Sequence, residues 1–124
     1  MKLPEKVLID DIEYKVEEVS HKELQLSSED LKGEYWGDTR YKQASIRICE
    51  GMAEDEAKIT LVHEIIHAIL QERGFDQQNN DEAMVDGLAH AIRMLAKQNS
   101  ELIKEVLSWN QKVWKRVKAL KSAC

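Results

Sequence analysis

The chain has 124 residues, of which 43% are hydrophobic and 33% charged, and its formal net charge is −5. These values are typical of one globular domain over residues 1–124, and they argue against a disordered chain. The acidic balance argues against nucleic-acid binding by the chain as a whole, and no apolar run approaches the ~20 residues of a membrane span. The two cysteines, Cys49 and Cys124, are too few for a disulfide framework, so we expect a reducing, cytoplasmic compartment.

The first fifty residues predict strands. The runs 6–9 and 12–16 flank Asp10-Asp11, which resembles a short hairpin connection. Residues 44–49 form a third run, in which Ile46 and Ile48 alternate with polar residues. This period-two pattern predicts a strand with one buried face. That strand could be an edge strand that accepts an extended substrate, or equally an ordinary strand of the sheet.

Three helices are predicted after residue 50. Apolar residues recur at three- and four-residue spacing over 53–73, with acidic residues in the first turn and Gly74 as a C-terminal cap. Residues 75–80 are expected to be loop, and a second helix then covers 80–98. A third helix, 100–120, follows. Strands followed by helices indicate an α+β fold, which we expect to be a small antiparallel sheet packed on the three helices.

The motif His63-Glu64-Ile65-Ile66-His67 lies within the first of these helices. Four residues turn a helix by about 400°, so both imidazoles project from one face and can reach a single ion. Glu64 lies about 100° around the helix, beside the ion, where it can serve as general base toward a water molecule. Paired core or surface histidines are the alternative, but the Glu at this offset favours a zinc site, with one zinc per chain.

The second helix offers a third ligand. Glu82, Asp86 and His90 follow one another at four-residue steps and therefore share one face. A carboxylate there would complete a His-His-Glu site and leave one position open, as in catalytic zinc centres. We favour Glu82 as the ligand over Asp86 and His90. Asp86, one turn further on, could then accept the free ring N–H of His63 or His67.

These residues resemble a known family. The motif HEIIH, followed by Glu82-Ala83-Met84-Val85-Asp86, is similar to the gluzincin arrangement in the reduced form of small bacterial and phage peptidases of the ImmA/IrrE type. The resemblance covers about residues 35–98. It implies a zincin-like fold and a zinc metallopeptidase, with His63, His67 and Glu82 as ligands and Glu64 as catalytic base. It also implies a protein or peptide substrate, such as a regulatory protein of the repressor kind.

Two other functions stay open. The first is an interaction module that holds zinc but cleaves little, although Glu64 argues against it because a structural zinc site needs no base. The second is DNA binding by the last helix, since residues 101–124 hold six Lys or Arg against two Glu. Trp109 and Trp114 lie among these basic residues, yet at helical spacing they fit packing better. An oxyanion donor could come from Tyr35, Tyr41 or His90.

Overall fold

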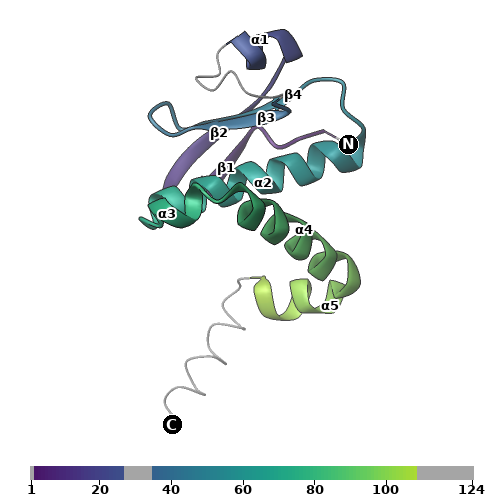
Figure 1. Cartoon of the computed structure of the whole chain (residues 1–124). Coiled ribbons are helices and arrows are strands. Elements are labelled where there is room, and N and C mark those ends of the chain that lie inside the picture. The colour runs from purple at the N-terminus through teal and green to yellow at the C-terminus, as the bar shows by residue number, and fades with distance from the viewer. Residues whose placement is uncertain (1, 27–34, 109–124) are drawn as a thin grey trace. The chain divides into compact units, whose positions relative to one another are not determined.

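The computed structural model describes residues 2–26 and 35–108. The chain divides into two compact units, residues 1–90 and residues 91–124, and we describe each by itself. The first unit is a four-stranded sheet with a long helix, α2, across one face (Figure 1). Its strands are β1 (Lys6–Ile9), β2 (Ile12–Val19), β3 (Gly37–Arg40) and β4 (Ser45–Cys49).

The strand order is β1-β2-β4-β3, and the sheet is mixed. The pairs β1/β2 and β3/β4 are antiparallel, but β2 and β4 are parallel. The prediction of an antiparallel sheet is therefore wrong for the central pair. After β2 the chain passes through α1 (His21–Leu26) before it enters β3, and this long connection lets β4 return in the direction of β2. The α+β class itself is correct.

The first hairpin is the one that the sequence indicates. Ile9 pairs with Ile12, so Asp10 and Asp11 form a two-residue connection. Asp10 has φ 53, in the left-handed region that tight hairpins require and that Asp tolerates better than most residues.

Strand β4 is an ordinary inner strand of the sheet, one of the two positions expected for it, and its burial differs from the prediction. It lies between β2 and β3, so it is not an edge strand. Among the described residues β3 is the edge strand on that side of the sheet. All five of its residues are buried, including Ser45 and Arg47, which were expected to face solvent. The Arg47 side chain is buried because it forms a two-point ion pair with Asp38 on β3, Nε to Oδ1 at 2.9 Å and Nη2 to Oδ2.

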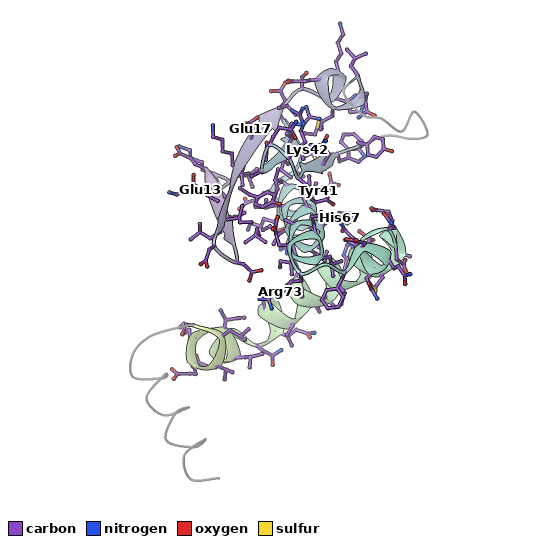
Figure 2. All side chains as sticks on the ribbon, turned by 90° about the vertical axis from the view of Figure 1, so that its left-hand side faces the viewer. Glu13, Glu17, Tyr41, Lys42, His67 and Arg73 are labelled. Carbon is purple, nitrogen blue, oxygen red and sulfur yellow. The ribbon has the colours of Figure 1, made fainter. Side chains whose placement is uncertain are left out.

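The main core lies between the sheet and α2 (Glu54–Glu72). Its buried members include Tyr14, Ile46 and Ile48 from the sheet and Leu61 and Ala68 from the helix. A smaller cluster, in which Leu24 of α1 packs on Val19 and Cys49, adds a second buried group at the end of β2 and β4. Figure 2 shows Glu13 and Glu17 on the side of β2 away from α2. The sheet and this core hold α2 in place, and α2 carries the histidine motif.

Helix α2 ends where the sequence predicts. The amide of Phe75 donates to Leu70 O and that of Gly74 to Gln71 O, the pattern of a Schellman motif, with Gly74 at φ 77. A short helix, α3 (Asp76–Asn79), then occupies the segment that was expected to be loop. Asp81 accepts from the amide of Met84 and so caps α4 (Glu82–Gln98), whose first part packs on α2 through Val85, Ala89 and Ile66.

The second unit contains the last turns of α4, then α5 (Ser100–Leu102) and η1 (Ile103–Leu107), a π-helical turn. The helix expected over 100–120 is thus helical to Leu107, and Ser108 is extended. Its remainder, with Trp109, Trp114 and most of the basic residues, lies outside the described residues. Within the described ranges no helix combines the length and the apolar character that crossing a bilayer requires.

Candidate metal centre

Two imidazoles converge on one carboxylate at the meeting of α2 and α4. His63 Nε2 lies 3.1 Å from Glu82 Oε2, and His67 Nε2 lies 2.8 Å from Glu82 Oε1. The ligand atoms of these three residues all lie within 4.8 Å of one another, and the group could hold a metal ion. It is the one such group of His, Cys, Asp or Glu that the described part of the chain contains.

The other ring nitrogen of each histidine, Nδ1, also lies within hydrogen-bond distance of a side-chain oxygen. His63 Nδ1 lies 3.3 Å from Asp86 Oδ1, and His67 Nδ1 lies 2.6 Å from Asn79 Oδ1. Such contacts orient a ligand imidazole and fix its tautomer, because the Nδ1–H donates to the oxygen and leaves the Nε2 lone pair for the ion. Asn79 is buried on α3, so this short helix supplies one of the two oxygen atoms that contact the histidine Nδ1 atoms.

Each ring faces more acceptors than a neutral imidazole can satisfy. A neutral ring has one N–H, whereas both nitrogens of His63 and both nitrogens of His67 lie beside oxygen atoms. Once Nδ1–H has donated, a lone pair on Nε2 would face a carboxylate oxygen, which is unfavourable. A cation placed between Nε2 and Glu82 removes this conflict in both rings at once, so the donor set fits a metal ion.

Glu64 is buried beside this group. It retains 6% of its accessible surface, and the Thr39 hydroxyl lies 3.0 Å from both its Oε1 and its backbone oxygen. Burial raises the pKa of the Glu64 carboxyl above its ordinary range, and the charge of Glu82 adds to the rise, while His63, His67 and Thr39 oppose it. A raised pKa makes a carboxylate a stronger acceptor for a proton than an ordinary carboxylate is.

The group opens into a cleft of about 890 Å³. Strand β3 lines one side with Thr39, and Tyr41 of the following turn lies near His67 (Figure 2). The Tyr41 hydroxyl accepts a hydrogen bond from Asn79 Nδ2 at 2.9 Å. Burial raises the pKa of Tyr41, and the charges of Glu64 and Glu82 add to this, whereas the bond from Asn79 lowers it.

The structure brings most of the sequence-derived site residues together. The ligand atoms of His63, His67 and Glu82 converge. Glu64 lies beside these three residues, and Asp86 contacts His63. His90 does not reach the group: its Nε2 lies 3.7 Å from Asp86 Oδ2, and its side chain is exposed.

Sequence reasoning missed the contact of Asn79 with His67, because Asn79 lies in the segment that was expected to be loop. No residue spacing within one helix marks it, since its partner lies on another element. The available signal was its position, in a polar segment that joins the two helices expected to share the site.

Comparison with protein-family models, with curated proteins and with solved structures gives no match. The function of this chain is therefore inferred from the chemistry of the site.

Proposed function

We propose that this chain is a zinc-dependent peptidase in which His63, His67 and Glu82 bind the ion and Glu64 is the general base. The observation that carries the proposal is the double contact of each imidazole: Nε2 toward Glu82, and Nδ1 toward an oxygen of Asp86 or Asn79. That arrangement leaves both Nε2 lone pairs directed at one point, as metal-binding histidines require.

Zinc is the ion that the donor set favours. Two imidazoles and one carboxylate are a ligand set of hydrolytic zinc sites, which keep a fourth position open. When bound, the ion supplies Lewis-acid polarisation of a substrate carbonyl and activation of a water molecule. Manganese and iron also accept such ligands, so the metal's identity belongs to the test.

Glu64 would act on the water and then on the leaving group. Its carboxylate takes a proton as water attacks the peptide carbonyl, and it returns that proton to the departing amine. Thr39 holds one carboxylate oxygen through its hydroxyl, so the side chain is positioned before a substrate arrives. A structural metal site would have no need of this buried carboxylate.

The substrate we propose is a protein segment in extended form, bound along β3. This strand is an edge of the sheet in the described residues and lines the cleft beside Glu64. A free strand edge offers unpaired backbone groups to which an extended peptide can bind. The resemblance to the small bacterial and phage peptidases of the ImmA/IrrE type supports a regulatory protein, such as a repressor, as the substrate.

Metal content tests the first part of the proposal. Wild-type protein should retain one zinc per chain after dialysis, as measured by plasma mass spectrometry, and His63→Ala and Glu82→Ala should lose it. Asp55→Ala, a change to an exposed carboxylate in the first turn of α2, is the control and should retain zinc. A wild type that takes up no zinc when supplied with it would overturn the proposal.

Glu64→Gln separates a peptidase from a zinc-holding interaction module. The variant keeps the size of the side chain and should keep the metal. Cleavage of a library of unstructured peptides, read by mass spectrometry, should fall by at least roughly a hundredfold if Glu64 is the base. Zinc-loaded wild type that cleaves no library peptide, and behaves as the variant does, would favour the module instead.

A further inference from the structure

Asn79 connects a metal-site histidine to a tyrosine in the cleft. Its Oδ1 lies 2.6 Å from His67 Nδ1, and its Nδ2 lies 2.9 Å from the Tyr41 hydroxyl oxygen. Asn79 and His67 are both buried, whereas Tyr41 is 36% exposed and lines the cleft. The three side chains come from α3, α2 and the turn after β3, so the connection joins separate parts of the first unit.

The direction of each hydrogen bond follows from the state of His67. If His67 binds a cation through Nε2, its one proton must be on Nδ1, and that N–H must donate to Asn79. The amide of Asn79 then presents oxygen to His67 and its NH₂ group to Tyr41. The Tyr41 oxygen must accept, so the hydroxyl proton is not used in this contact.

That proton has no acceptor among the hydrogen bonds of the described residues, where Tyr41 Oη appears only as the acceptor from Asn79. Tyr41 lines the same cleft as Glu64 and Glu82. A tyrosine phenol is protonated at neutral pH, because its ordinary pKa is about 10. A free donor is therefore available beside the place where the carbonyl would react.

We propose that Tyr41 is the catalytic oxyanion donor of this site, and that metal loading at His67 sets its direction through Asn79. The inference rests on the proposed peptidase function. As the water oxygen bonds to the carbonyl carbon, the π electron pair moves to the carbonyl oxygen and Glu64 takes the water proton. Tyr41 donates a hydrogen bond to that oxygen and transfers no proton.

Two metal-directed probes test the donor without a known substrate. A phosphinic dipeptide carries tetrahedral anionic oxygens like those of the reacting carbonyl, whereas a dipeptide thiol reaches the metal through sulfur alone. Calorimetry on zinc-loaded protein should show that Tyr41→Phe lowers the affinity for the phosphinic probe by roughly ten- to a hundredfold. The thiol should bind as it does to the wild type. Tyr35→Phe, a second tyrosine of the same cleft, should leave both affinities unchanged.

Asn79→Asp tests the relay while Tyr41 remains in place. The new carboxylate still accepts from His67 but cannot donate, so the Tyr41 hydroxyl would turn to donate to it and leave the cleft. The phosphinic probe should then bind about as weakly as it does to Tyr41→Phe. The affinity of the thiol, per zinc-loaded chain, should fall by less than twofold.

The outcomes separate the two proposals. Equal binding of the phosphinic probe by wild type and Tyr41→Phe, or equal weakening of both probes, would overturn the donor role and leave the metal centre standing. A zinc-loaded wild type that binds neither probe has no open metal position, and both proposals would then fail.

Discussion

Nδ1 of His67 lies 2.6 Å from Oδ1 of Asn79, and both side chains are buried. The contact joins α2 to α3, a helix of four residues that the Schellman turn at Gly74 directs back toward the site. A histidine that must bind a metal through one nitrogen needs a fixed acceptor on the other, and Asn79 supplies it.

Removal of this acceptor should weaken metal binding. Asn79→Ala leaves the His67 ring free to rotate and to change tautomer, so zinc affinity should fall by roughly 10- to 100-fold. Competition with a chromophoric chelator measures the change. Asn80→Ala, at the exposed neighbouring position, is the matched control and should bind zinc as the wild type does. Equal affinities for the two variants would mean that Asn79 does not orient the ring.

Gly37 should be required for the approach of β3 to α2. A Cβ at this position would lie 2.8 Å from Thr60 Cγ2 and 3.0 Å from the backbone oxygen of Arg47. Since the backbone cannot yield easily, Gly37→Ala should lower the free energy of unfolding by about 1–3 kcal/mol, as measured in urea.

The control for that change is Gly87→Ala in α4, where an added Cβ meets nothing within 4 Å. Alanine favours the helix over glycine, so this variant should be stabilised by about 0.5–1 kcal/mol. If Gly37→Ala proved neutral or stabilising as well, the tight packing of β3 on α2 would be disproved.

Tyr14 should stabilise the fold in a pH-dependent way. Its side chain is fully buried, and its hydroxyl donates to Glu72 Oε1 at 2.7 Å, so Tyr14→Phe should cost about 1.5 kcal/mol at pH 7. Burial, followed by the bond to Glu72, raises the pKa of Tyr14 in the folded state.

The sign of the pH effect follows from that raised pKa. The contribution of Tyr14 is complete below the ordinary tyrosine pKa of about 10 and is lost as the pH rises above it, since the unfolded state then ionises first. The difference in unfolding free energy between wild type and Tyr14→Phe should therefore shrink above about pH 10. Urea titrations at neutral and alkaline pH measure it, and a constant difference would contradict the assignment.

The buried ion pair of Arg47 and Asp38 should depend on the shape of the guanidinium group. Two of its nitrogens contact the two carboxylate oxygens, and the Arg47 side chain is only 4% exposed. Lysine cannot make this two-point contact, so Arg47→Lys should destabilise the protein by about 2 kcal/mol. Arg40→Lys, at an exposed position of β3, should stay within about 0.5 kcal/mol of the wild type in thermal unfolding. Similar melting temperatures for the two variants would show that the two-point geometry of the pair adds nothing to stability.

Much of the candidate site could be predicted because it depends on one helix at a time. The spacing of His63 and His67 places both rings on one face of any α-helix, and that of Glu82 and Asp86 does the same on the next. The hairpin at Asp10-Asp11 and the end of α2 at Gly74 are also local, since the residue types there favour the backbone angles that are found.

What the tertiary structure decided is how separate elements meet. The parallel pairing of β2 with β4 depends on the path of the chain through α1, which no strand pattern encodes. Arg47 is buried because Asp38 of a neighbouring strand satisfies its charge, so its polarity alone predicted the wrong face. Asn79 and Tyr41 reach His67 from different elements. Periodicity reports the face of a single helix or strand, whereas these contacts depend on packing between elements that lie apart in the sequence.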